Sequence, residues 1–378
     1  TLEYRKETTK TYSENNWKVV RGEKPELFEK LLQKIKDNNP DVICFSVVYS
    51  SQAFYTLALL KELKDYKTVI GGPAVNEKLI NEATTFLKNE KELLDFVGNK
   101  KEEIVEKVSL DFKIFNLNEY FCPSPVLPLK TSTTCFYQKC AYCSHYSGCK
   151  YEEYDLDSIE ETIKKSGAKH FFLMDEMIPV PRLLKLAELF KRLNVYWTCQ
   201  LKPIKLMTKD VLKRLYDSGM TQIMWGVESA NNRVLKLMNK GTNVEDVAEV
   251  LKNSHEVGIK NIVYIIFGFP TETKEELLET IDFMVKNSEH IDLVSTSIFG
   301  LHSGTPIYKN PEKFGISKII EEKRTVLDPK ITYEVSEGLT QEEASKIRQG
   351  YKLTLDKINK YPKTMNFFRE HMFYIIRK

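Results

Sequence analysis

Residues 131–149 have the sequence TSTTCFYQKCAYCSHYSGC, and they follow an apolar, β-branched run typical of the end of a buried strand. Within them Cys135, Cys140 and Cys143 have the spacing C-x4-C-x2-C. Three close cysteines suit an iron–sulfur cluster whose last iron stays open to another kind of ligand, because thiolates are the ligands that such clusters select. The stretch therefore predicts a metal site on one loop, with chemistry at the open iron.

A zinc knuckle fits the same loop equally well, with Cys149 or His145 as the fourth ligand. The chain holds seven cysteines, and four of them lie in residues 135–149. An odd, clustered set without a signal peptide is not typical of a secreted disulfide framework. Cysteine usage thus favours metal ligation in a reducing cytoplasm, and it leaves the choice of metal open.

The composition describes an ordinary globular chain of 378 residues, 42% hydrophobic and 29% charged, whose length suits two domains. The 56 basic and 53 acidic groups nearly cancel, and the formal charge of +3 does not favour nucleic acid or an anionic membrane as a partner. No apolar run approaches the roughly 20 residues of a membrane helix. We therefore expect a cytoplasmic protein with no membrane and no nucleic-acid partner.

Residues 1–100 alternate helix-like and strand-like segments. Helical spacing over residues 26–37 precedes the apolar run DVICFSVVYSS, and a second helical pattern leads to the short strand TVIGGP. This order predicts a shortened, doubly wound, Rossmann-like α/β sheet. Ligands of such sheets lie at the carboxyl ends of the strands, where Ser46, Gly71 and Gly72 fall. The glycines would let a ligand approach the backbone closely.

Residues 126–310 repeat a strand and a helix. The strand-like runs are VLPLKTSTT, HFFLMD, VYWTCQL, QIMWGV, NIVYIIFGF and LVSTSIF. Alternation at this spacing predicts a parallel sheet, and six units without a sign of closure predict a partial (β/α)6 barrel. Residues 101–125 are a charged linker to the front domain, and residues 311–378 form a C-terminal helical extension in which Thr340 begins a capping box.

Polar residues follow the apolar strands of this expected barrel. They are Asp175 and Glu176 after the second strand, Gln200 after the third, Glu228 and Ser229 after the fourth, and Gly268 after the fifth. Because the carboxyl ends of parallel strands meet at one edge, these groups and the cysteine loop share that edge. Such an array suits a zwitterionic, ribose-bearing ligand. The position of the loop after the first strand then favours an open-iron cluster over zinc.

Four motifs together resemble the radical S-adenosylmethionine (SAM) enzymes. They are the cysteine loop with Tyr142 before its third cysteine, the strand WGVES, the helix RVLKLMNKGT and the strand GIKNIVYIIFGFPTET. The resemblance covers about residues 126–310. The commonest loop of that family is C-x3-C-x2-C, whereas four residues separate Cys135 and Cys140 here. We expect the three thiolates to bind the cluster all the same, and the extra residue leaves the subfamily open.

The front domain resembles the cobalamin-binding domain in the strand end at Ser46 and in the turn Gly71-Gly72. The family's first signature, Asp-x-His-x-x-Gly, is absent. It would fall near or before Thr1, where the chain begins without methionine, so truncation and loss are both open. If cobalamin binds, the resemblance implies a form with no protein histidine on cobalt. The alternative is a vestigial sheet that only braces its neighbour.

The resemblance also implies roles for single residues. Cys135, Cys140 and Cys143 would bind a four-iron four-sulfur cluster, and SAM would chelate its fourth iron. The further cofactor contacts would be Asp175 and Glu176 for the amino group, Glu228 and Ser229 for ribose and carboxylate, Ile266 and Gly268 for adenine, Tyr142 and Gln200 beside them, and Ser46, Gly71 and Gly72 for cobalamin. Arg233 and Lys240 are weaker candidates for the carboxylate, since each is expected on a helix, where a surface charge is an equally good interpretation.

By this resemblance the chain is expected to be a cobalamin-dependent radical SAM methyltransferase acting on an unactivated carbon of a peptide or small molecule. A flavodoxin or ferredoxin would deliver its electrons. One alternative is a cobalamin-free radical cyclase, epimerase or crosslinking enzyme, and another is a non-enzymatic zinc or scaffold protein. A transfer RNA methylthiotransferase is disfavoured, because that family would need more cysteines in the front domain, where only Cys44 precedes Cys122.

Overall fold

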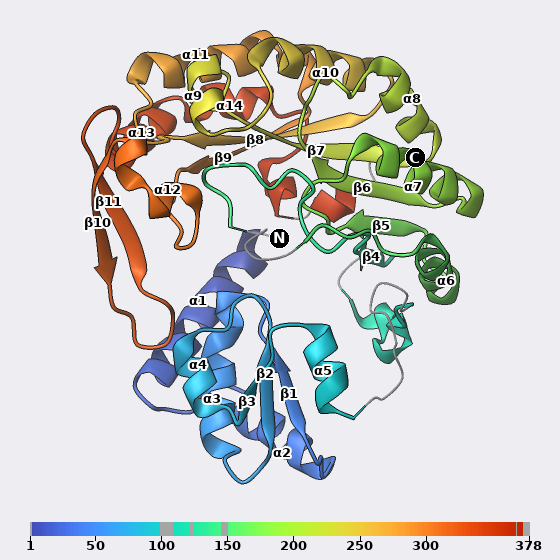
Figure 1. Cartoon of the computed structure of the whole chain (residues 1–378), viewed down its shortest axis with the longest axis vertical. Coiled ribbons are helices and arrows are strands. Elements are labelled where there is room, and N and C mark those ends of the chain that lie inside the picture. The colour runs from blue at the N-terminus through green and yellow to red at the C-terminus, as the bar shows by residue number, and fades with distance from the viewer. Residues whose placement is uncertain (1, 99–108, 121–123, 145–149, 368, 373–378) are drawn as a thin grey trace. The chain divides into compact units, whose positions relative to one another are not determined.

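The computed structural model describes residues 2–98, 109–120, 124–144, 150–367 and 369–372. Its packing divides the chain into a front unit, residues 1–105 with 321–330, and a barrel unit, residues 106–320 with 331–378. Figure 1 labels the elements of both units. The segment that sequence patterns assign to one C-terminal extension is thus divided between the two units.

The front unit contains a small parallel sheet of three short strands. Its elements are α1 (Leu2–Val20), α2 (Phe28–Asp37), β1 (Ile43–Ser46), α3 (Ala53–Glu62), β2 (Thr68–Gly71), α4 (Glu77–Glu82), β3 (Thr85–Phe86) and α5 (Glu90–Phe96). The strands stand in the order β1-β2-β3, which is also their order along the chain. The predicted α/β class is confirmed, and α1 is a helix that its weak periodicity had left unassigned.

A segment distant in sequence completes the core of the front unit. Val326 is 1% exposed and packs with Val47 and other apolar residues that follow or line the strands. The side chain of Asn76, which caps α4, donates a hydrogen bond to the backbone oxygen of Val326 at 3.0 Å. Val326 belongs to the tip of a hairpin formed by β10 (Ile316–Glu322) and β11 (Lys330–Val335). The prediction of a helical extension over residues 311–378 did not include this hairpin.

The barrel unit is built on a six-stranded parallel sheet in the order β4-β5-β6-β7-β8-β9. Its remaining elements are β4 (Val126–Leu129), α6 (Leu156–Ser166), β5 (His170–Leu173), α7 (Val180–Leu193), β6 (Tyr196–Leu201), α8 (Lys209–Asp217), β7 (Met220–Glu228), α9 (Asn232–Leu237), α10 (Val244–Glu256), β8 (Lys260–Phe267), α11 (Lys274–Lys286), β9 (Leu293–Ile298), α12 (Pro306–Lys309), α13 (Gln341–Gly350) and α14 (Lys352–Ile358). Figure 1 shows helices α6, α7, α8, α10 and α11 along the outer side of the curved sheet. The predicted partial (β/α)6 barrel is confirmed.

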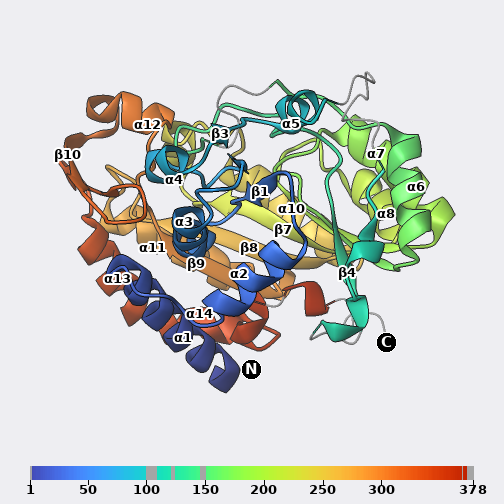
Figure 2. The same ribbon diagram turned by 90° about the horizontal axis from the view of Figure 1, so that it is seen from below.

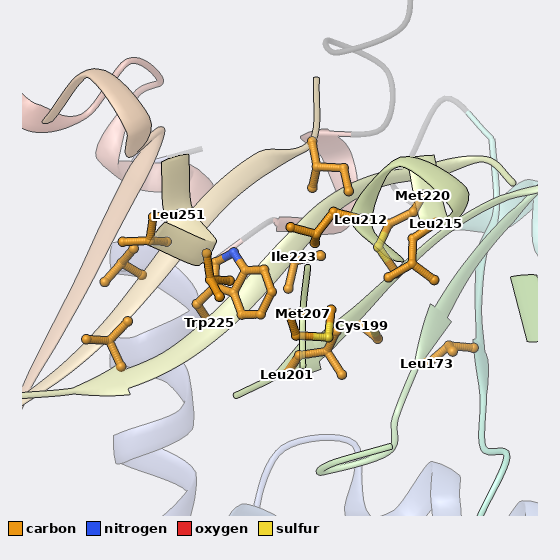
Figure 3. Close-up of a cluster of buried hydrophobic side chains, with 14 of the residues drawn as sticks. Leu173, Cys199, Leu201, Met207, Leu212, Leu215, Met220, Ile223, Trp225 and Leu251 are labelled. Carbon is orange, nitrogen blue, oxygen red and sulfur yellow. The ribbon is translucent and has the colours of Figure 1, made fainter. Parts of the chain in front are cut away.

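The main core lies between this sheet and its outer helices (Figure 3). Ile223 and Trp225 on β7 belong to it, and the indole of Trp225 donates to Asn261 at 2.7 Å. Because side chains alternate along a strand, the neighbouring Gly226 and Glu228 face the other side, where the strand ends meet the cysteine loop. Cys199, whose face the sequence left undecided, is fully buried in the same core.

The C-terminal helices cover one edge of the barrel. Helices α13 and α14 pack against β9, and α14 also packs against α11 (Figure 2). The predicted capping box is confirmed, since Thr340 and Glu343 each bond the other's backbone at the start of α13. Farther on, Met372 is fully buried with Met224, Ile262 and Leu293. None of the helices in these ranges is long and apolar enough to cross a bilayer.

Candidate functional site

A cavity of about 510 Å³ lies where β5, β6 and β7 end and the cysteine loop begins. The predicted residues on its wall are Cys135, Cys140, Tyr142, Cys143, Asp175, Glu176, Gln200, Glu228 and Lys240. His302, from the loop after β9, reaches the same wall. The fold thus gathers residues from six separate parts of the barrel unit around one space.

The three cysteines of the loop are partly buried, and all border this cavity. Within the part of the chain that the structure describes, no three Cys, His, Asp or Glu side chains converge as ligands of one metal ion. The three thiols border one common space, which has room for a multi-iron cluster. Cys149 and His145, the proposed fourth zinc ligands, lie outside the described residues, as does Cys122.

The two ends of the cysteine loop are joined at its base. Ser132 forms a bridge with Glu153, and the backbone N–H of Tyr154 donates to Thr131 O at 2.9 Å. The buried carboxylate of Asp175 accepts bonds from the backbone and hydroxyl of Thr131 at 3.0 to 3.1 Å and from the hydroxyl of Ser132 at 2.5 Å. Asp175 therefore holds the loop in place, although resemblance had assigned it to the amino group of SAM.

Glu176 differs from its neighbour in having an unused acceptor. Its Oε2 is buried and has no hydrogen-bond partner among the described residues, and the side chain lies on the cavity wall. An unsatisfied buried carboxylate oxygen costs free energy unless a donor occupies the adjacent space. Glu176 is thus better placed than Asp175 to receive an ammonium group in the cavity.

Glu228 and Lys240 form a buried ion pair across the cavity wall. Lys240 Nζ lies 2.8 Å from Glu228 Oε1 and donates to the hydroxyl of Tyr142 at 3.1 Å. Burial lowers the pKa of Lys240, but Glu228, followed by Tyr142, outweighs it and holds that pKa well above its ordinary value. A Cβ on Gly226 would lie 2.8 Å from Glu228 Oε1, so a larger residue there would displace the pair. Lys240 is buried beyond the end of α9, so of the two interpretations left open for it, a cofactor contact or a surface charge on a helix, the surface charge is wrong.

Lys202 and Tyr137 are wall residues to which the family motifs give no role, although Lys202 stands just beyond Gln200 at the third strand end. Lys202 is 6% exposed, and its Nζ lies 2.9 Å from the centroid of the Tyr137 ring. Burial is the main cause that lowers the pKa of Lys202 to about 8. The signal available in the sequence was weak, because Lys202 follows the end of β6 by one residue and Tyr137 lies in the lengthened spacer of the cysteine loop.

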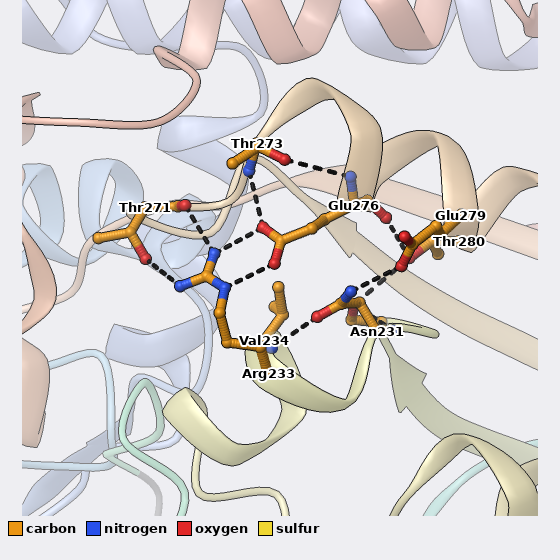
Figure 4. A network of polar contacts seen from close by, with 9 residues as sticks. Asn231, Arg233, Val234, Thr271, Thr273, Glu276, Glu279 and Thr280 are labelled. Atoms are coloured by element: carbon orange, nitrogen blue, oxygen red, sulfur yellow. Dashed lines mark hydrogen bonds and ion pairs between the residues drawn. The ribbon is translucent and has the colours of Figure 1, made fainter.

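Four other predicted residues of the barrel are placed away from this wall in the described chain. Ser229 is fully buried against Thr280, and Arg233 on α9 binds Glu276 at 2.5 Å and Thr271 at 2.7 to 3.0 Å (Figure 4). The other two are Ile266, which packs in an apolar cluster, and Gly268, whose N–H donates to Glu272 at 2.5 Å. Arg233 thus fastens the β8–α11 turn to α9.

In the front unit, Ser46 and Gly71 pair at the carboxyl ends of β1 and β2. A Cβ on Gly72, which has φ +111°, would lie 2.4 Å from the backbone oxygen of Val47. Close packing of the protein's own backbone therefore requires this glycine, where the sequence had suggested close approach of a ligand. Ser46 is exposed. Tyr49, which lies just beyond β1, is 62% exposed.

Comparison with known proteins shows what the barrel is similar to. Residues 129–284 match the family model of the radical SAM superfamily. An uncharacterised methyltransferase of Pyrococcus horikoshii is 24% identical over 348 residues, which are 78% of this chain and 75% of that protein.

Two solved structures have a similar fold. The apo form of OxsB, a cobalamin-dependent SAM radical enzyme, aligns with a TM-score of 0.62 and 16% identity, and covers 87% of this chain and 60% of its own. The radical SAM methyltransferase TsrM from Kitasatospora setae, with cobalamin and a [4Fe-4S] cluster bound, aligns with a TM-score of 0.59 and 14% identity over 77% of this chain and 71% of its own. The chain thus spans about three fifths of the length of OxsB.

Proposed function

We propose that this chain, whose residues 129–284 match the radical SAM superfamily model and whose relatives include a methyltransferase, is a cobalamin-dependent radical SAM methyltransferase acting on an unactivated carbon of a peptide or small molecule. The observation that carries the proposal is the common cavity wall formed by three cysteine thiols, the unpartnered oxygen of Glu176 and the Glu228–Lys240 pair. The donor set matches a cluster of four irons held by three thiolates and closed by a zwitterionic ligand.

Different residues of the cavity wall would bind the cluster and the separate groups of SAM. Cys135, Cys140 and Cys143 would hold the cluster, and Glu176 would accept the ammonium group of SAM through its buried oxygen. Glu228, which is 8% exposed and forms an ion pair with Lys240, would accept hydrogen bonds from the ribose hydroxyls of SAM. When bound, the cluster would supply the electron that breaks a carbon–sulfur bond of SAM and yields a deoxyadenosyl radical. The buried pair of Glu228 and Lys240 would help to keep water from that part of the cavity.

The exposed end of the front sheet supports cobalamin as the second cofactor. Ser46 offers a hydroxyl there, while Val48 and Tyr49 present apolar surface that is 45% and 62% accessible. A corrin has an apolar rim with amide groups, so such a mixture can accommodate it. The described front unit contains no histidine that could bind cobalt. We propose a flavodoxin or ferredoxin of the cytoplasm as the electron donor.

Anaerobic reconstitution tests the proposal. The purified protein should take up iron and sulfide, retain cobalamin as judged by its visible spectrum, and convert SAM into both 5′-deoxyadenosine and S-adenosylhomocysteine. Cys140→Ala should lose iron, whereas Cys44→Ala, which changes an exposed cysteine of the front unit, should keep it. Deoxyadenosine alone would leave a radical enzyme without methyl transfer, and zinc without iron would refute the whole assignment.

A further inference from the structure

The spacer between the first two cysteines, Phe136–Lys139, is pinned to the loop that follows α9. The hydroxyl of Tyr137 donates to Asn239 O at 2.8 Å, and the side chain of Asn239 donates to Lys139 O at 2.7 Å. Gln138 between them adopts φ +49°, the left-handed conformation of a tight turn. A Cβ on Gly241 would lie 2.3 Å from the Tyr137 hydroxyl, so this loop leaves room for the tyrosine only with glycine there.

The pinned tyrosine lies against Lys202. The Nζ of Lys202 is 2.9 Å from the centroid of the Tyr137 ring and donates a hydrogen bond to Lys240 O at 2.7 Å. Both partners are uncharged groups. No carboxylate of the described chain lies within ion-pair distance of this ammonium, which is 6% exposed and part of the cavity wall. Lys202 is thus a buried cation held by an aromatic face and a carbonyl.

Burying an ammonium group without a counter-charge costs several kcal/mol of stability. Proteins keep such a group where a negative charge binds next to it. The second lysine of the wall, Lys240, does not need that charge, because Glu228 lies 2.8 Å from it. Of the two wall lysines, Lys202 is therefore the one without a carboxylate partner among the described residues, and it shares the wall with Cys135 and Cys140. Three thiolates on a four-iron cluster in its resting state leave one net negative charge, which is opposite in sign to the ammonium of Lys202.

We propose that Lys202, seated on Tyr137 of the lengthened spacer, is the counter-cation of the cluster held by Cys135, Cys140 and Cys143, and that it raises the reduction potential of that cluster. The inference rests on the cluster of the proposed function. A nearby positive charge stabilises the reduced cluster more than the oxidised one, because reduction adds negative charge. The extra spacer residue is then the feature that brings the tyrosine over the lysine. Lys202 is a positioning residue in this account and does not react.

Redox titration of the anaerobically reconstituted protein, followed by the electron paramagnetic resonance of the reduced cluster, tests the inference. In Lys202→Met the ratio of reduced to oxidised cluster at a fixed potential should fall about tenfold, which is about 59 mV for one electron. Lys202→Arg should stay near wild type because it keeps the charge. Lys205→Met is the matched control, since Lys205 is exposed three residues farther on. Tyr137→Leu should shift the potential in the same direction as Lys202→Met, and Tyr137→Phe should not.

The outcomes separate this inference from the proposed function. A wild-type protein that takes up no iron refutes the proposed function and the inference with it. A Lys202→Met protein with full iron and a wild-type potential overturns the inference alone. Failure to assemble the cluster in Lys202→Met but not in Lys202→Arg supports charge compensation, whereas failure in both variants overturns it.

Discussion

Glu272 makes the stability of the barrel unit depend on pH. It is 1% exposed in the turn between β8 and α11, and its Oε2 accepts the backbone N–H of Gly268 at 2.5 Å. The other oxygen, Oε1, is buried without a partner among the described residues. Burial outweighs the hydrogen bond and raises the pKa of Glu272 from 4.5 to about 7.

The sign of the effect follows from the direction of this change. Because the pKa is higher in the folded state, the folded protein keeps a proton that the unfolded chain has lost between pH 4.5 and about 7. The stabilisation is fully present below pH 4.5, and it is lost as the pH rises through 7. A rise in pKa from 4.5 to about 7 corresponds to roughly 3 kcal/mol in the free energy of unfolding.

Urea unfolding of wild type and of Glu272→Gln, from about pH 5 to about pH 8, measures this term. The glutamine cannot ionise, so the free energy of unfolding of wild type should fall by most of the roughly 3 kcal/mol relative to the variant. Glu275→Gln, an exposed residue of the first turn of α11, should retain the wild-type pH dependence. Equal pH slopes for wild type and Glu272→Gln would refute the reasoning.

Three further changes test the site and the core. Glu176→Gln should keep the iron content but weaken SAM binding about tenfold or more, measured by equilibrium dialysis, because a buried bond to a charged acceptor contributes about 1.5 to 3 kcal/mol; undiminished binding would exclude Glu176 from the SAM site. Glu228→Gln should lower the free energy of unfolding by about 3 to 5 kcal/mol, because it leaves Lys240 buried without a counter-charge; a neutral result in urea would contradict the ion-pair argument. Leu212→Ala, at a fully buried position of the outer core (Figure 3), should cost about 2 to 5 kcal/mol by the same measurement, and a loss below this range would mean that the core collapses into the space left.

The pattern of strands and helices was predictable from the sequence, because burial repeats locally. The barrel strands are mostly apolar runs. Helices such as α6 and α13 begin at a capping residue whose side chain accepts a hydrogen bond from the backbone N–H three positions later. Helix α1 has little periodicity, and the hairpin β10–β11 is mostly polar and exposed, so neither gave a local signal. The hairpin tip is ordered by contacts with residues about 250 positions away, such as the bond from Asn76 to Val326.

Within the site, the sequence determined the three cysteines, their place after the first barrel strand, and the polar strand ends. Only the tertiary structure decided which of those polar groups reach the cavity. Asp175 and Glu176 are neighbours in the chain, yet one is saturated by the loop base and the other keeps a free oxygen. Lys202 and Tyr137 lie 65 positions apart, and their contact depends on how one spacer residue turns the loop. Side-chain direction and hydrogen-bond partners at a strand end are set by packing between distant segments, which spacing along the chain does not encode.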